Sequence, residues 1–452
     1  MNPLNIRVSL LIFLISITPS TLFAKDWSKP NNSDAGENVV GQVTNYSDHY
    51  FEFRSAEIEL GDAETKHIRS TLKSMDDIIK YGFNTVTVTL ICGFTEEGVK
   101  RRFDNANKQN RILDGLIGSC YNPTFRTRYK DGSEWRAKNV TALEMYANHA
   151  HKLGLRFNLK PMVLTHIETY GLNGMSKQSF WQGDKNFVAY SDFIVDLASI
   201  AEANKIEYFT IGTELTNLNK KILRSPELTD LIEGVREVYS GKLIYAHNFG
   251  PEGSGNEFRK MTKIWERLDY IGVNFFPNNI MKGRKSYSSE QVAKAMESAR
   301  IDGRNVISEI RNVSAKVNRP VILTETAFPS WKGAANYMYR GTCDRANAGK
   351  KDWVFTKGPL QPKTPDLDEP LVLAKAWWQV FGNMPNIAGA VHVFWTGPGE
   401  RVLEYYLKNK NAPERERKLK KILDDRECDA YMWKKETGVK EFFQQKYINR
   451  SD

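Results

Sequence analysis

Two stretches of the sequence decide the fold: Glu207-Tyr-Phe-Thr-Ile-Gly-Thr-Glu214 and Pro320-Val-Ile-Leu-Thr-Glu325. Each is a short, mainly apolar run that ends in a single acidic residue. Runs of this kind are typical of strands that are buried on both faces of a parallel sheet. A glutamate that closes such a run would lie at the carboxyl end of the strand, where α/β barrels hold their reactive groups.

Similar short runs recur along the chain and alternate with longer helical patterns. The eight candidate strands are Val39–Asn45, Asn84–Leu90, Arg156–Met162, Glu207–Thr213, Lys242–Asn248, Asp269–Phe276, Pro320–Thr326 and Gly389–Thr396. The helical patterns between them are Glu64–Tyr81, Thr141–Leu153, Ser179–Ala203, Pro226–Tyr239, Asn256–Leu268, Ser289–Val317 and Pro370–Phe381, and a last helix follows the eighth strand. Eight strands, each followed by a helix, predict an α/β fold of the (β/α)8 TIM barrel type.

Two connections of this barrel are long. One runs from Thr95 to Lys138 after the second strand, and the other runs from Pro329 to Glu369 after the seventh. Both follow the carboxyl end of a strand, so they are expected over the face where barrel enzymes carry their chemistry, or else as decoration without substrate contact.

The first 24 residues have the pattern of a signal peptide. Arg7 precedes the apolar segment Val8–Ile17, and cleavage after Ala24 is expected, although an uncleaved anchor is the alternative. Residues 25–38 then read as a polar linker, and residues 39–452 as a single catalytic domain with a basic helical tail. Because no later segment reaches transmembrane length, we expect a secreted or periplasmic protein with no membrane span after cleavage.

Four cysteines fit an oxidising compartment. Cys92, Cys120, Cys343 and Cys428 allow three pairings, and a Cys92–Cys120 bridge would leave Cys343 to pair with Cys428. Four buried thiols are the alternative. No C-x-x-C spacing occurs, so neither a metal site nor a redox site is expected, and no cofactor is predicted.

Composition and charge restrict the partners. The 452 residues are 41% hydrophobic and 12% aromatic, which suits a large core and aromatic surfaces that stack on sugars. The net charge of +10 favours an anionic glycan partner, but an ordinary basic surface accounts for it equally well. Since no nucleic-acid-binding motif accompanies the charge, we expect no nucleic acid partner, and we expect a monomer.

Glu214 and Glu325 are the candidate catalytic pair. They end the fourth and seventh candidate strands, which lie on opposite sides of an eight-stranded barrel, so their carboxylates would face each other across its mouth. One such glutamate could simply accept hydrogen bonds, but two in these positions suit double displacement at a sugar.

Four stretches resemble glycoside hydrolases of the retaining clan A, and more narrowly family 113, which is known for endo-β-1,4-mannanases. They are Leu153-Gly-Leu-Arg-Phe-Asn-Leu-Lys-Pro161, Phe209-Thr-Ile-Gly-Thr-Glu-Leu215, Gly241-Lys-Leu-Ile-Tyr-Ala-His-Asn248 and Pro320-Val-Ile-Leu-Thr-Glu325. The resemblance implies Glu214 as the general acid/base and Glu325 as the nucleophile of a hydrolase that cleaves a β-linked polysaccharide, either mannan-like or from a cell envelope.

One departure from the clan pattern concerns the sugar. Many clan members have Asn immediately before the acid/base, where it binds the 2-hydroxyl of the sugar, whereas this chain has Thr213. A threonine hydroxyl can still donate a hydrogen bond, with Asn248 or Asn274 as further candidates.

The other candidate substrate-binding residues lie at strand ends or in the following loops. Trp395 matches the clan's stacking platform, with a core tryptophan as the alternative. Lys160 is expected to point inward, to a hydroxyl or carboxylate, or else to extend to solvent. Alternation along the fifth strand lets only one of His247 and Asn248 face the mouth, and we favour Asn248. The remaining candidates, which ordinary packing would also explain, are His166 and Trp181.

Two other functions share these features. A barrel that binds glycan without turnover is one alternative, and the presence of both glutamates argues against it. A transglycosylase is the other, and it would use the same residues with a sugar as the acceptor.

Overall fold

Short strands alternate with helices from Phe53 to Tyr447 in the computed structural model of the chain, and eight strands close into one parallel barrel. The structure describes residues 51–59, 67–94, 121–122, 127–128, 132–165, 184–215, 227–249, 255–277, 280–284, 286–301, 303–329, 332–336, 338, 343–344, 361–362, 366–393 and 437–448. All of them lie in one compact unit, Val43–Asp452.

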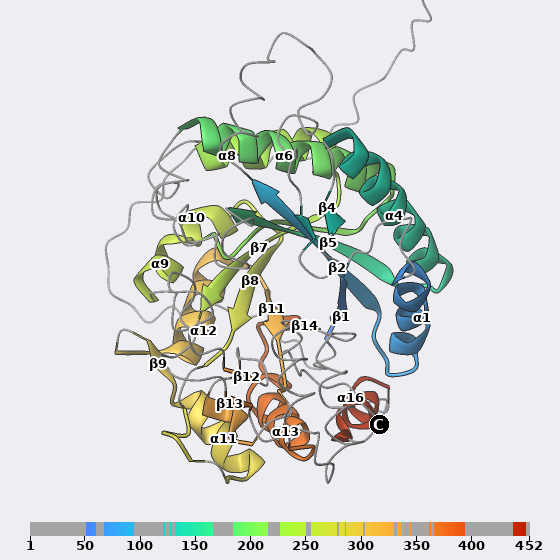
Figure 1. Cartoon of the computed structure of the whole chain (residues 1–452). Coiled ribbons are helices and arrows are strands. Elements are labelled where there is room, and N and C mark those ends of the chain that lie inside the picture. The colour runs from blue at the N-terminus through green and yellow to red at the C-terminus, as the bar shows by residue number, and fades with distance from the viewer. Residues whose placement is uncertain are drawn as a thin grey trace, which may run out of the picture. The chain divides into compact units, whose positions relative to one another are not determined.

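The barrel strands follow one another around the ring in chain order (Figure 1). They are β1 (Phe53–Glu59), β2 (Thr85–Phe94), β5 (Arg156–Thr165), β6 (Tyr208–Thr213), β7 (Lys242–Phe249), β8 (Tyr270–Phe275), β11 (Val321–Thr326) and β14 (Ile387–His392). All eight neighbouring pairs are parallel, and β14 pairs with β1 to close the ring. The predicted (β/α)8 TIM barrel is therefore confirmed.

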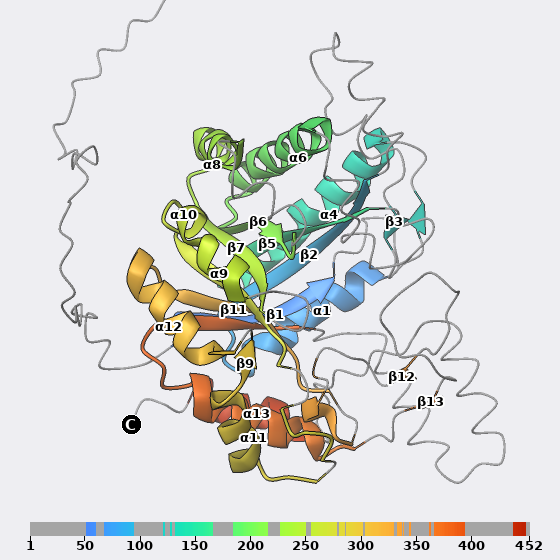
Figure 2. The same ribbon diagram turned by 90° about the vertical axis from the view of Figure 1, so that its left-hand side faces the viewer.

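Helices surround this ring of strands. They are α1 (His67–Ile79), α4 (Gly132–Lys152), α6 (Asp184–Ala203), α8 (Glu227–Val238), α9 (Gly255–Lys260), α10 (Thr262–Trp265), α11 (Ser289–Glu297), α12 (Val306–Val317), α13 (Glu369–Phe381) and α16 (Val439–Tyr447). Figure 2, turned by 90°, shows α6 and α8 on one side of the barrel and α11 and α13 on the opposite side. None of the described helices is long and apolar enough to cross a membrane.

Three two-stranded pieces lie outside the barrel. The strands β3 (Tyr121–Asn122) and β4 (Thr127–Arg128) pair in the connection after β2. The strands β12 (Cys343–Asp344) and β13 (Gln361–Pro362) pair in the connection after β11. The strands β9 (Arg300–Ile301) and β10 (Arg304–Asn305) form a small hairpin between α11 and α12.

The predicted first strand was wrong. The barrel begins with Phe53–Glu59 and not with Val39–Asn45, which lies outside the described residues. The sequence Phe-Arg-Ser-Ala-Glu-Ile-Glu contains three charged residues, so it lacks the apolar run that marks the other strands. It is nevertheless a barrel strand because polar side chains at Ser55 and Glu57 find partners inside the barrel.

The helix predicted over Ser289–Val317 is also wrong as a single element. It is divided into α11 and α12 by the β9–β10 hairpin. Gly303 has a φ of +75°, which a helix does not allow, and the side chain of Asn305 accepts a hydrogen bond from Ser308 N at 2.8 Å and so begins α12.

Barrel closure depends on the absence of a side chain at Gly389. A Cβ atom at this position would lie 1.7 Å from the carbonyl oxygen of Phe53, so any other residue would push β14 away from β1. A glycine within a strand often marks this kind of close backbone approach.

The barrel interior is filled in layers, as the alternation of side chains along a strand requires. The lowest layer is aromatic, with Tyr208 stacked edge-on against Phe53 at 4.9 Å between ring centroids. Above it lies a hydrogen-bonded belt in which Asn158 Nδ2 donates to Thr87 Oγ1 at 3.1 Å and Thr210 Oγ1 donates to Asn158 Oδ1 at 3.2 Å. The residues two positions further along β2 and β5, Thr89 and Lys160, belong to the next layer, which contains the candidate site.

Candidate active site

Glu214 and Glu325 are both placed by an irregularity in their strands. In β6 the register with β7 shifts between Thr210 and Thr213, and in β11 the register with β8 shifts between Ile322 and Glu325. Each shift inserts one extra residue just before the acid. Such bulges bend a strand and redirect the following side chain, and they are common beside active sites.

The backbone of Glu214 is in a left-handed conformation. Its φ is +53°, which is rare for a residue with a side chain and costs about 1–3 kcal/mol. Its N–H donates to the carbonyl oxygen of Ala246 on β7 at 3.0 Å, and this bond helps to hold the conformation. A strained glutamate at the end of a barrel strand indicates that its position matters more than local stability.

Asn274 on β8 links the two acids. Its Nδ2 donates to Glu214 Oε1 at 2.9 Å, and its Oδ1 accepts from the Thr324 hydroxyl at 2.7 Å. In the sheet, Asn274 is the register partner of Glu325. The amide of Asn274 is therefore fixed from behind by Thr324 and orients the carboxylate of Glu214.

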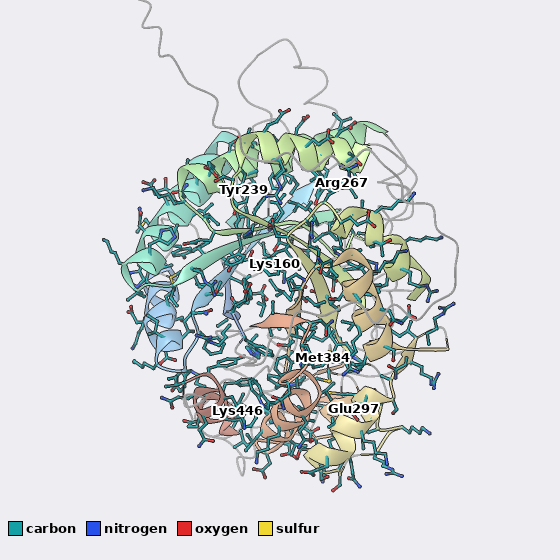
Figure 3. All side chains as sticks on the ribbon, turned by 180° about the vertical axis from the view of Figure 1, so that it is seen from behind. Lys160, Tyr239, Arg267, Glu297, Met384 and Lys446 are labelled. Carbon is teal, nitrogen blue, oxygen red and sulfur yellow. The ribbon has the colours of Figure 1, made fainter. Side chains whose placement is uncertain are left out.

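Lys160 on β5 contacts Glu325 directly. Its Nζ donates to Glu325 Oε1 at 2.5 Å and lies 3.5 Å from Glu57 Oε1 on β1, and its side chain is only 1% exposed. Figure 3 shows Lys160 at the centre of the barrel. Of the two environments expected for this side chain, the structure has the inward one, with carboxylates as the partners.

The charges around Lys160 determine its protonation. Burial alone would lower the pKa of Lys160, but the charges of Glu325 and Glu57, the hydrogen bond to Glu325 and the charge of Glu214 together raise the pKa of Lys160 above its ordinary value. The lysine is therefore held in its charged form beside Glu325 in the free enzyme.

Glu57 is a site residue that the sequence did not reveal. It is 8% exposed and accepts a hydrogen bond from the Thr89 hydroxyl on β2. Burial raises the pKa of Glu57, the charge of Lys160 lowers it, the charge of Glu325 raises it further, and the bond from Thr89 lowers it; the net direction is upward. The signal for this residue is the alternation Phe53, Ser55, Glu57, which becomes visible only once the strand is recognised.

Thr213 lies directly before Glu214 and is 1% exposed. Its Oγ1 has no hydrogen-bond partner among the described residues. A buried hydroxyl without a partner costs about 1–3 kcal/mol, so this group is a candidate to bind a substrate hydroxyl.

His247 and Asn248, near the carboxyl end of β7, have different surroundings. His247 is fully buried against the rings of Phe258 and Trp265 in the helical layer, and burial lowers the pKa of His247 to about 4. Asn248 is the register partner of Asn274 and is half-buried. The structure thus places Asn248 on the same face of the sheet as the two acids.

Three predicted substrate-binding residues lie outside the described residues: His166, Trp181 and Trp395. The same holds for Cys120 and Cys428, so the disulfide pairings remain predictions. Within the described part of the chain, no three His, Cys, Asp or Glu side chains are grouped as metal ligands.

A closed (β/α)8 barrel with two glutamates at its fourth and seventh strands is the arrangement of clan A glycosidases. The model of Glycoside Hydrolase Family 113 matches residues 127–353, a range that contains both glutamates, Lys160 and Asn274. The chain belongs to glycoside hydrolase family 113. The predicted class of enzyme is thereby confirmed, and its substrate is a polysaccharide or oligosaccharide.

Solved structures show the same fold. The family 113 β-mannanase AaManA from Alicyclobacillus acidocaldarius, in complex with ManMIm, superposes with a TM-score of 0.54 at 16% identity over 89% of this chain and 98% of that chain. Another family 113 β-1,4-mannanase gives a TM-score of 0.51 at 15% identity over 88% of this chain and 99% of that chain. A comparison with curated proteins finds no match.

Proposed function

We propose that this glycoside hydrolase cleaves β-1,4-linked mannan by double displacement, with Glu325 as the nucleophile and Glu214 as the general acid/base. The observation that carries the assignment is Asn274, whose amide holds Glu214 and whose register partner is Glu325. Family membership supports the reaction class, and the similar β-mannanase structures support mannan as the substrate.

In the first step, a carboxylate oxygen of Glu325 attacks the anomeric carbon and forms an ester bond with it. The bond to the leaving oxygen breaks, and that oxygen takes the proton of Glu214. Lys160 holds Glu325 Oε1, so the other carboxylate oxygen is the one free to attack.

In the second step, Glu214 takes a proton from water, and the water oxygen attacks the anomeric carbon. The ester bond breaks, and Glu325 recovers its negative charge. Each step inverts the anomeric carbon, so the product keeps the β configuration of the substrate.

Thr213 and Asn248 are the proposed contacts to sugar hydroxyls. The Thr213 hydroxyl is buried beside Glu214, and Asn248 is next to Asn274 in the sheet. We also propose export from the cytoplasm through the leader of residues 1–24, because a polymeric mannan is found outside the cell.

The assignment is tested with Glu325→Ala and Glu214→Ala on an aryl β-mannoside with an activated leaving group. Glu325→Ala should lose at least about a thousandfold in kcat/KM, since it removes the group that attacks in the transition state of the first step. Glu214→Ala should lose mainly kcat on this substrate, because the activated leaving group departs without a proton but the attacking water still needs a base. Azide should partly rescue both, and the anomer of the glycosyl azide, read by NMR, identifies the role of each residue.

In Glu214→Ala, azide replaces water in the second step and should give the β-azide. In Glu325→Ala, azide replaces the nucleophile on the β-linkage and should give the α-azide. Wild-type activity in either variant, or the opposite anomers, would refute the assignment. Products longer than the substrate from unlabelled mannan oligosaccharides would identify a transglycosylase instead.

A further inference from the structure

Lys160 is shared between two carboxylates that differ in their fate during the reaction. Glu325 gives up its charge when it forms the ester with the sugar, whereas Glu57 takes no part in bond making. Lys160 Nζ lies 2.5 Å from an oxygen of Glu325 and 3.5 Å from an oxygen of Glu57. Both ion pairs are largely shielded from water, with exposures of 1% for the lysine side chain, 11% for Glu57 and 13% for Glu325.

A buried cation needs a negative charge beside it both in the free enzyme and in the ester intermediate. Removing one partner of a buried ion pair is strongly destabilising, because it leaves the other charge without compensation. In the free enzyme, Glu325 provides that compensation at close range. In the ester intermediate it cannot, and the carboxylate of Glu57 remains in place beside the same lysine.

The surroundings of Glu57 suit this task. The Thr89 hydroxyl donates to the Glu57 oxygen that also faces Lys160. Among the described residues, the charged groups that act on Lys160 and Glu57 are Glu325 on β11 and Glu214 after β6, besides each other. Among the described residues, Lys160 is the cation in ion-pair contact with Glu57, so the charge of Glu57 depends on this lysine.

We propose that Glu57 is a positioning residue that acts through Lys160: it supplies the counter-charge that keeps this lysine protonated and in place while Glu325 is esterified. The proposal rests on the proposed role of Glu325 as the nucleophile. It adds a second, non-reacting carboxylate to the site, and this carboxylate matters most in the intermediate, where Glu325 has lost its charge.

The inference is tested with Glu57→Gln, which keeps the size and the acceptor oxygen of the side chain but removes the charge. The substrate is an aryl β-mannoside whose leaving group is so good that breakdown of the intermediate limits kcat. The variant should lose about tenfold in kcat, which corresponds to the loss of one buried charge-assisted hydrogen bond. When kcat is plotted against pH, the fall at high pH (the basic limb) should begin at a lower pH in the variant. Without the charge of Glu57, Lys160 in the intermediate loses its proton more readily.

The basic limb of kcat/KM reports the free enzyme, in which the proposed acid Glu214 must hold its proton and Glu325 still pairs with Lys160, so this limb should move less. Glu57→Asp, which keeps the charge, should restore the limb of kcat toward its wild-type position. The control is Ser55→Ala in the layer below, which removes a hydroxyl bonded to Thr87 and should leave both limbs in place.

Thr89→Val provides a second variant in case Glu57→Gln does not fold. It removes a donor that favours the charged form of Glu57, so the limb of kcat should move in the same direction by a smaller amount. An unchanged limb in the folded variants would overturn the proposal, as would a loss of kcat that Glu57→Asp fails to reverse. An inactive Glu325→Ala with an unchanged Glu57→Gln would refute this inference alone, whereas an active Glu325→Ala would refute the proposed function.

Discussion

At the residue scale, Thr213 and Glu214 each have a feature that is unfavourable for folding. Glu214 has a left-handed backbone, and the hydroxyl of the residue before it is buried without a described partner. Both features cost folding free energy, and both occur where the substrate would be held. Strain and unsatisfied groups that cluster at one point are a signature of a functional site.

Replacing Thr213 with valine separates the substrate-binding role from a packing role. Valine has the same shape but no hydroxyl, so it removes a buried unsatisfied group and should leave stability unchanged or slightly higher. If the hydroxyl binds a sugar, kcat/KM on mannan oligosaccharides should fall about tenfold.

The measurements are steady-state kinetics and a thermal unfolding midpoint on the same preparation. Thr213→Ser, which keeps the hydroxyl, is the matched control and should retain most of the activity. Full activity in Thr213→Val would contradict the role given to this residue.

The sequence pointed to the two proposed catalytic acids but not to Glu57, which contacts the same lysine. Glu214 and Glu325 each close an apolar run, which made them visible. Glu57 and Ser55 are polar inward side chains on a strand without a continuous apolar run, so the strand itself was missed. Val39–Asn45 has more β-branched residues and no charged ones, and pattern alone favoured it. Lys160 was expected to point inward, but its two partners come from distant strands that only the closed barrel brings together.

At the scale of elements, the segment after β11 is held by a small polar cluster. Tyr287 donates to the Glu369 carboxylate at the start of α13, and Ala335 N donates to the Tyr287 hydroxyl at 2.9 Å. Asn336 Oδ1 accepts from Gly283 N at 3.0 Å. The segment after β11, which includes the short 3-10 helix Ala334–Asn336, is thereby tied to the segment after β8 and to α13.

This cluster should make stability depend on pH. Burial raises the pKa of Glu369 to about 7, partly offset by the bond from Tyr287. Because the folded pKa lies above the unfolded value of 4.5, the unfolded chain ionises first, and stability falls as pH rises from 4.5 to about 7. The contribution is about 3 kcal/mol at about 1.4 kcal/mol per pKa unit.

Glu369→Gln should remove this contribution, so its unfolding free energy should depend less on pH across that window. Tyr287→Phe removes a donor to the carboxylate and should extend the fall to higher pH. Urea unfolding at several pH values measures both effects. Equal slopes for the wild type and Glu369→Gln would show that Glu369 does not titrate in the folded protein as described.

Element boundaries were predictable where the signal was local. The strands that end at Thr213 and Thr326 were placed from their apolar runs, and the predicted carboxyl end of each strand agrees with the structure. The division of Ser289–Val317 was not foreseen, because its helical periodicity continues through Gly303, and the positive φ of that glycine is set by the hairpin. The two bulges were also invisible, since each depends on the register with a neighbouring strand.

At the scale of the whole molecule, the barrel converts separate strand ends into one site. The site residues contact one another only because the ring is closed. They come from β1, β5, β8 and β11 and from the position directly after β6. Gly389 permits that closure by letting β14 approach β1. Counting eight strand–helix units was enough to predict this architecture, even with the first strand misplaced, because the alternation of elements fixes the fold class.

Retention of configuration is the property that depends on the whole arrangement of Glu214 and Glu325. The most direct measurement is proton NMR of the first product released from β-1,4-mannan oligosaccharides, recorded before mutarotation mixes the anomers. We expect the β-anomer to appear first and the α-anomer to grow only later. If the α-anomer appears first, then the reaction is a single displacement and Glu325 is not its nucleophile.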